Sequence, residues 1–135
     1  MNEQLTKQLQ DEFPDYFMDL YGDPRRTCMA FGLEVGDGWF GIIHKLCTNI
    51  KEVLKDVEKD PENPFRFAQI KEKWGILRIY TEGYHESVSK LIEAAEQESS
   101  QVCENCGSTE NVSRSGGWIK TLCAKCRGGN ETKQA

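Results

Sequence analysis

The sequence predicts an α+β protein in which N-terminal helices pack with a β-hairpin, followed by a C-terminal zinc ribbon or treble-clef module. Three observations carry this prediction: a long amphipathic segment at 39–58, a strand-turn-strand pattern at 65–82, and two Cys-x2-Cys pairs near the C-terminus. The 135 residues are enough for one core. We expect an α+β domain at 1–101, a docked four-cysteine module at 102–128 and a flexible tail at 129–135.

The first 35 residues predict short elements. Apolar side chains recur every fourth residue over 3–13, which predicts a helix. Gly-Asp-Pro-Arg-Arg at 22–26 predicts a turn, because Gly and Pro favour chain reversals. Residues 27–35 are then expected to be extended.

Residues 39–58 give the clearest helix signal. Their apolar side chains follow the i, i+3, i+4, i+7 pattern of a single buried face. Asp37, in a Gly-Asp-Gly stretch, is the expected N-cap, and Asp-Pro-Glu-Asn-Pro at 60–64 is expected to end the helix.

Residues 65–82 predict a β-hairpin with arms at 65–71 and 76–81. Gly75 in the intervening turn can take the positive φ that a tight turn needs. The second arm is apolar on both faces except at Arg78, so we expect both faces to be covered. A second amphipathic helix is predicted at 85–101.

That helix leads almost directly into Cys103 and Cys106, and sixteen residues separate them from Cys123 and Cys126. Each Cys-x2-Cys turn aims two sulfurs at one point, so the two pairs together predict a tetrahedral site for one structural Zn²⁺. Gly-Gly at 116–117 predicts a hairpin turn between the pairs. The module is a zinc ribbon, or a treble clef if residues 124–130 are helical. The short connection predicts that it docks at a fixed angle.

Charge and composition favour some classes of protein over others. Residues 102–135 hold 3 acids and 5 bases, but four thiolates around one Zn²⁺ add a net charge of −2, so the basic patch typical of nucleic-acid binders is largely missing. No apolar run approaches a membrane span. The first residues show no signal peptide and four cysteines have metal-site spacing, so we expect a cytoplasmic protein.

The exposed-looking aromatic and charged residues are the candidate partner contacts. Trp74 lies at the predicted turn, where it either faces a partner or folds back over the core. Trp, Tyr and Arg dominate binding hot spots, which adds Arg78 on the same hairpin. Trp118 and Lys120 are the corresponding candidates in the cysteine module.

Few residues in the sequence have the spacing of a known catalytic site. The two histidines, His44 and His85, are 41 residues apart. His44 and Cys47 have the spacing of a nucleophile pair on one helix face, but no third group lies at a recognisable spacing to orient them. A packing role is the favoured interpretation for His44, and we expect that the protein is not an enzyme.

Two segments resemble known proteins. Glu-Lys-Trp-Gly-Ile-Leu-Arg-Ile-Tyr at 72–80, followed by the C-E-N-C-G and G-G-W-I-K-T-L-C-A-K-C stretches, resembles a group of small uncharacterised phage and prophage proteins with an E-K-[FW]-G-x-L-R-[FIY]-Y hairpin and a four-cysteine end. The likeness covers about residues 65–126 and implies a phage-encoded accessory protein acting in the host cytoplasm. The zinc finger of the TraR/DksA-type RNA-polymerase regulators is also similar, since there too a helix leads into C-x2-C-G and a second C-x2-C, but the long N-terminal coiled coil of that family is not evident here.

Three functions are considered, in order of expectation. The first is a non-enzymatic binding protein, a phage or mobile-element factor that binds and inhibits or redirects a host protein. The second is a nucleic-acid-binding or transcription-linked zinc protein, which would use the basic residues around the cysteines: Arg114, Lys120, Lys125, Arg127 and Lys133. An enzyme with a site built from His44, Cys47 or Arg78 is the third.

Overall fold

The computed structural model describes residues 1–83 and 85–128 and is α+β, with two antiparallel hairpins. In chain order the elements are α1 (Glu3–Glu12), η1 (Cys28–Phe31), η2 (Asp37–Trp39), α2 (Phe40–Leu54), β1 (Arg66–Lys73), β2 (Ile76–Glu82), α3 (Glu86–Ser99), β3 (Val112–Ser115) and β4 (Lys120–Cys123). The flexible tail expected at 129–135 lies outside the described residues. Within the described part of the chain, no helix combines the length and apolarity needed to cross a bilayer.

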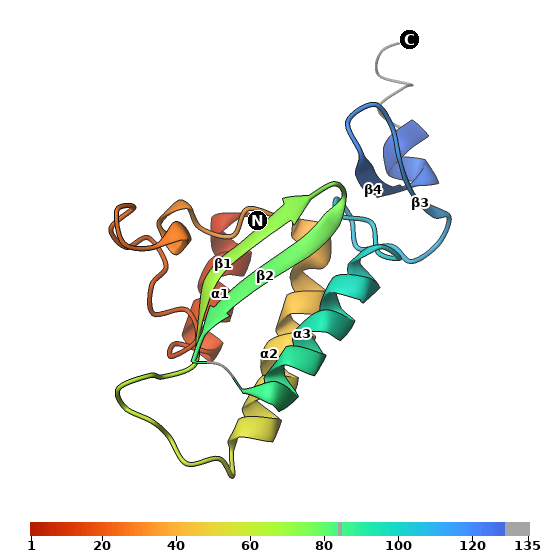
Figure 1. Ribbon diagram of the computed structural model, residues 1–135. Helices are drawn as coiled ribbons and strands as arrows, with labels where there is room; N and C mark the ends of the chain where they lie inside the picture. The colour runs from red at the N-terminus through yellow and green to blue at the C-terminus, as the bar shows by residue number, and fades with distance from the viewer. Residues whose placement is uncertain (84, 129–135) are drawn as a thin grey trace.

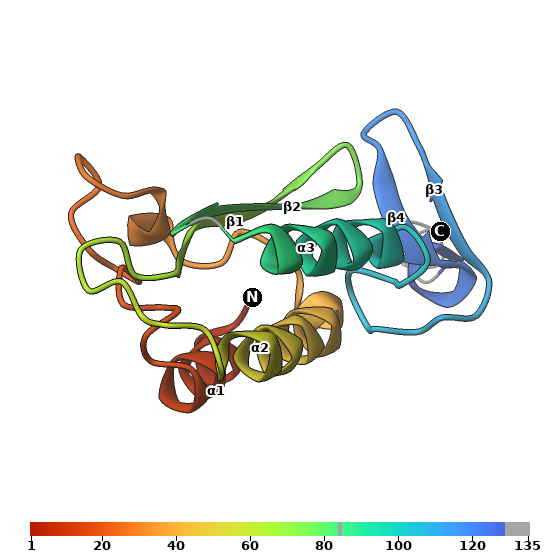
Figure 2. The same cartoon turned by 60° about the horizontal axis from the view of Figure 1, so that its bottom comes forward.

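The β1–β2 hairpin and the three α-helices form two layers. Figure 2 shows the hairpin above and the helices below it, with α3 directly under the hairpin and α1 and α2 further away. The inner side chains of the strands meet the apolar faces of the helices in one core. Its largest fully buried members are Trp39, Phe17, Phe67, Leu9 and Met29.

The register of the β1–β2 hairpin divides its side chains between two faces. Ile70 pairs with Ile79, and both are buried, whereas the neighbouring pair of Lys71 with Arg78 points the other way. The expectation that β2 is covered on both faces was therefore wrong, because all three α-helices lie on one side (Figure 2). Arg78 is exposed on the open face.

The β1–β2 turn is tighter than the sequence indicated. Lys73 pairs with Ile76, so only Trp74 and Gly75 form the turn, with φ of 57° and 77°. Positive φ at both central residues defines the type I′ turn, whose twist matches that of a hairpin. Gly75 tolerates this conformation as predicted, and Trp74 adopts it although it has a side chain.

Both edges of this two-stranded sheet are occupied. On the β1 side, Glu34 donates its N–H to Ile70 O at 3.0 Å and accepts from Glu72 N at 3.2 Å. On the β2 side, the N–H of Leu77 donates to Ser99 Oγ at 3.0 Å and the N–H of Ile79 donates to Glu96 Oε2 at 2.9 Å. Side chains of α3 therefore satisfy the edge groups that a third strand would use.

Two local predictions in the N-terminal third were wrong. Residues 27–35 are not extended throughout, since η1 occupies part of them and the Thr27 side chain caps it by accepting from Met29 N at 3.0 Å. Asp37 does not cap α2. Its carboxylate instead accepts from Asn2 N and Asn2 Nδ2, at 2.7 and 3.0 Å, and so ties the start of α1 to the segment before α2.

Truncating a side chain on the buried face of β2 is expected to cost more stability than truncating one on the open face. Leu77 is fully buried, so Leu77→Ala is expected to lower the free energy of unfolding by about 3 kcal/mol through lost apolar contact and the cavity left behind. Tyr80 is half exposed on the same strand, and Tyr80→Ala is expected to change it by less than about 0.5 kcal/mol. Urea denaturation of both variants checks this, and equal losses would contradict the one-sided sheet.

Candidate metal centre and its docking onto the hairpin

Four cysteine sulfurs converge at the C-terminal end of the described chain. The Sγ atoms of Cys103, Cys106, Cys123 and Cys126 all lie within 4.8 Å of one another. Those of Cys106 and Cys123 are 3.7 Å apart. A tetrahedral Zn²⁺ site with Zn–S bonds of about 2.3 Å places its sulfurs about 3.8 Å apart, so the arrangement fits a four-coordinate thiolate site.

Local backbone geometry explains how the first pair comes together. Gly107 has a φ of 82°, which lets the chain reverse immediately after Cys106. Two bonds close this knuckle: Gly107 N donates to Cys103 O at 2.9 Å, and Cys103 N donates to Ser108 O at 2.9 Å. Both sulfurs are thereby turned to the same side.

The second pair is placed by a strand and the helical segment after it. Cys123 is the last residue of β4, and Cys126 follows within a helical segment at 124–128. Ala124 N donates to Asn111 O at 2.8 Å, which holds this segment against the start of β3. The predicted hairpin turn at 116–117 is confirmed, since β3 and β4 pair from Val112–Cys123 to Ser115–Lys120.

Hydrogen-bond donors surround the sulfurs. Asn105 Nδ2 donates to Cys126 Sγ at 3.2 Å, and Cys126 N donates to Cys123 Sγ at 3.4 Å. Burial disfavours the Cys103 thiolate, but the backbone N–H groups of Cys123, Cys106 and Asn105 outweigh this effect and lower its pKa to about 6. Donors of this kind stabilise the thiolate form that binds a metal.

The four sulfurs also compete with one another for negative charge. The Asn105 amide favours the Cys126 thiolate, but burial and the three neighbouring sulfurs raise the pKa of Cys126 to about 12. Four thiolates this close repel one another, and a divalent cation among them removes that repulsion. The donor set, its spacing and its charge therefore suit a thiophilic divalent metal.

The cysteine knuckle is pressed against the segment that precedes α2. Trp39 Nε1 donates to Val102 O at 2.9 Å inside the core. Gly38 N donates to Glu104 O at 2.8 Å, and Gly36 N donates to Glu104 Oε2 at 2.9 Å. A Cβ on Gly38 would lie 2.1 Å from Cys103 O, so only glycine permits this approach.

A second contact joins the β3–β4 hairpin to the β1–β2 turn. Thr121 Oγ1 donates to Gly75 O at 2.5 Å in a buried position, and Arg114 Nε donates to Trp74 O at 2.7 Å. Lys120 Nζ lies 3.9 Å from Glu72 Oε1. The two contacts hold the module from both sides, which agrees with the short connection after α3.

Glu104 lies buried between the knuckle and the glycine segment, with 7% of its surface exposed. Burial raises the pKa of its carboxyl group, and the Gly36 N–H and the charge of Lys120 offset part of that rise. Its Oε1 has no hydrogen-bond partner in the part of the chain that the structure describes. The carboxyl group is thus held by one backbone bond to the body of the protein.

Two of the predicted contact residues are exposed at the turns of the two hairpins. Trp74 at the tip of β1–β2 is 60% exposed, so it does not fold back over the core, and Trp118 in the β3–β4 turn is 80% exposed. The β1–β2 tip contacts β3–β4 at Arg114 and Thr121, and the β3–β4 turn projects beyond it (Figure 1). Lys120 is at the base of the second turn, whereas Arg78 lies further down β2 on its open face.

The basic residues around the cysteines are partly engaged in structure. Arg127 donates from both terminal nitrogens to the carbonyls of Ser113, Ser115 and Lys120, at 3.0–3.3 Å, and so clamps β3 to β4. Arg114 is bonded to Trp74 O. Lys125 is exposed, and Lys133 lies outside the described residues.

Of the groups considered for catalysis, His44 is engaged in packing and Cys47 is buried. His44 Nε2 is 2.8 Å from Glu12 Oε2, and its ring packs against Phe13 and Phe40, so it ties α2 to α1. Cys47 is fully buried, and burial raises the pKa of its thiol, with the Glu12 charge adding to the rise. A buried thiol with a raised pKa is a poor nucleophile.

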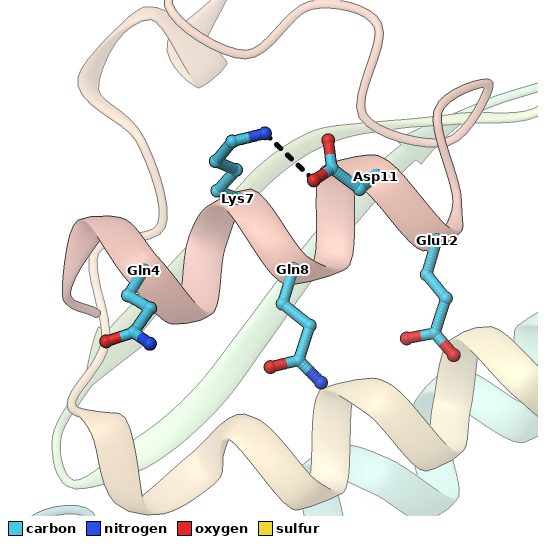
Figure 3. Close-up of a pocket in the computed structure, with 5 residues that line it drawn as sticks. All are labelled: Gln4, Lys7, Gln8, Asp11 and Glu12. Carbon is cyan, nitrogen blue, oxygen red and sulfur yellow. Dashed lines mark hydrogen bonds and ion pairs between the residues drawn. The ribbon is translucent and has the colours of Figure 1, made fainter.

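The surface depressions along α1 are open and polar. One is lined by Gln4, Lys7, Gln8, Asp11 and Glu12. Figure 3 shows Gln4, Gln8 and Glu12 on the side of α1 that faces α2, while Lys7 is paired with Asp11 at 2.9 Å on the other side. Neither His44 nor Cys47 lines these depressions.

Comparison of the chain with protein-family models, curated proteins and solved structures found no match. Its function is therefore inferred from its own residues and contacts.

Several residues that build this region were not singled out from the sequence. Gly36 and Gly38 were noted only as the neighbours of the expected N-cap Asp37, although paired glycines also permit close backbone approach. Thr121 and Glu104 gave no signal, because their partners are 46 and 68 residues away. Trp39 was expected on the buried helix face, but its indole N–H bond to Val102 O was not foreseen.

Two glycine substitutions test the docking. Gly38→Ala forces the added methyl group into Cys103 O, so it is expected to lower the free energy of unfolding by about 1–3 kcal/mol and to loosen the module. Gly41→Ala in α2 meets nothing within 4 Å, so it is expected to be neutral or to stabilise by about 0.5–1 kcal/mol. Thermal unfolding compares the variants, and a harmless Gly38→Ala would refute the close approach.

Proposed function

We propose that the four cysteines hold one structural Zn²⁺ in a treble-clef module. The support is the order of its parts: a cysteine knuckle, the β3–β4 hairpin, and a helical segment at 124–128 that carries the fourth sulfur. Zinc there supplies four bonds that replace a hydrophobic core too small for a segment of this length. Four protein ligands leave no position for substrate, so the proposed role is structural.

The proposed function of the chain is that of a non-enzymatic binding protein. Its contact surface, here called the tip surface, consists of Lys73, Trp74, Arg114, Trp118 and Lys120. Two exposed tryptophans beside three cations have the composition of a binding hot spot. The observation that carries the proposal is the Arg114 Nε to Trp74 O bond, because it fixes the β1–β2 tip against β3–β4 close to the turn that holds Trp118.

The backbone at Trp74 gives this proposal independent support. A non-glycine residue at a φ of 57° costs about 1–2 kcal/mol relative to an unstrained conformation, and Asn is far better suited to this position of a type I′ turn. Strain of this kind persists where the side chain has another use. An exposed tryptophan contributes little to the core, so binding is the use we propose.

The proposed partner is a host or phage protein. The ground for a factor that binds and modulates a host protein is the resemblance to small phage proteins that we inferred from the motifs at 72–80 and around the cysteines. A nucleic-acid role is the second candidate. It is less favoured because Arg114 and Arg127 donate to backbone carbonyls within the chain.

Trp74→Asn separates binding from folding. Asn relieves the strained turn, so the free energy of unfolding of the variant is expected to be up to about 1 kcal/mol higher than that of the parent. It is also expected to lose saturable capture of a host protein by the immobilised, metal-loaded chain. Trp118→Ala is expected to lose capture with unchanged stability, because the side chain is 80% exposed.

Phe31→Ala is the matched control, since Phe31 is 68% exposed but lies in η1, far along the chain from both tips. It is expected to retain capture in full. Retained capture by both tryptophan variants, or an equal loss with Phe31→Ala, would refute the tip surface as the binding site.

A further inference from the structure

The open face of the β1–β2 hairpin carries a cationic strip that continues from the tip surface. Cross-strand pairing places Lys71 opposite Arg78 and Lys73 opposite Ile76 on one face, with Tyr80 next along β2. Arg78 and Lys73 are exposed, and Tyr80 is 50% exposed. The helices lie on the other side (Figure 2).

The three cations of this strip form no ion pair with a described residue, although the exposed Glu34, bridged to Lys71, adds one carboxylate beside them. Like charges placed directly opposite each other, as Lys71 and Arg78 are, destabilise a sheet. Within residues 1–83 and 85–128, none of Lys71, Lys73 and Arg78 has an ion-pair partner within 4.0 Å. Yet the whole chain carries a net charge of −5, so the strip is a local positive region on an acidic protein.

The sheet edges limit how a partner can use this region. An extended peptide cannot add a strand beside β1 or β2, because Glu34 bonds one edge and Ser99 and Glu96 bond the other. A ligand must therefore lie across the open face and be held by side chains.

We propose that the strip binds an acidic segment of the partner protein, with carboxylates against Lys71, Lys73 and Arg78 and an apolar side chain against Tyr80. The inference rests on the proposed binding function and names the chemistry of its partner. Charge complementarity is the ground for it, since unpaired cations on an otherwise acidic chain attract and orient a short acidic surface.

A protein segment fits better than a nucleic acid. A nucleic acid presents an unbroken line of phosphates, and at the end of the strip away from the tip surface it would meet the carboxylates of Glu82 and Asp19, which already pair with Arg66. An acidic protein segment carries a limited number of charges and apolar side chains as well. Tyr80 and Trp74 supply the apolar contacts for such a segment.

The test uses the full metal-loaded chain and a fluorescein-labelled peptide in which Glu alternates with Leu. Fluorescence anisotropy is expected to show saturable binding that weakens with added salt. The double reversal Lys71→Glu with Arg78→Glu is expected to weaken it about tenfold. The matched control reverses Lys51 and Lys90, which are exposed on α2 and α3 and produce the same change in net charge, and it is expected to weaken binding less than twofold.

Far-UV circular dichroism and unfolding midpoints establish that both double variants are folded. No binding of the peptide, or equal weakening by both double variants, would overturn the proposal. Tighter binding of a single-stranded oligothymidylate of matched charge would also overturn it, in favour of nucleic acid. If the peptide fails while Trp74-dependent capture of a host protein persists, only the acidic chemistry is refuted and the proposed binding function stands.

Discussion

The four converging sulfurs are the constraint on which the C-terminal third of the chain depends. The segment from Cys103 to Cys126 has two four-residue strands and few buried apolar side chains, so it cannot fold on hydrophobic burial alone. A metal ion bound by all four sulfurs would cross-link its two ends and so fix the knuckle, the hairpin and the helical segment together. The turn that carries Trp118 projects beyond the residues that Arg127 and the β1–β2 tip hold, which leaves its side chain 80% exposed.

Docking converts this small module into part of a larger surface. The buried indole bond from Trp39 and the close approach at Gly38 fix one side, and the Thr121 and Arg114 bonds fix the other. Both sets of contacts involve backbone carbonyls, whose positions do not depend on side-chain rotamers. The β1–β2 tip is therefore fixed against β3–β4, and a partner of the kind proposed would meet two tryptophans on preset backbone at little ordering cost.

The sequence predicted the parts of this structure that depend on local periodicity or spacing. The α2 and α3 helices, the β1–β2 and β3–β4 hairpins and the convergence of four cysteines all follow from patterns within about 25 residues. Docking of the module was expected from the short connection after α3, but its contacts were not predictable, because they join Gly36 to Glu104 and Gly75 to Thr121 across long sequence separations. The open face of β2 was not predicted, because Ile76 and Tyr80 are apolar and so hid the alternation of buried apolar and exposed polar residues along the strand.

X-ray absorption at the zinc edge of the purified protein tests the proposed structural zinc site most directly. A closed four-cysteine site predicts stoichiometric zinc with four sulfur neighbours at about 2.3 Å and no nitrogen or oxygen bound to the metal. A bound oxygen would show an open coordination position. A substoichiometric metal content would show that no metal ion cross-links the four sulfurs in much of the protein. Either result would contradict a closed structural site.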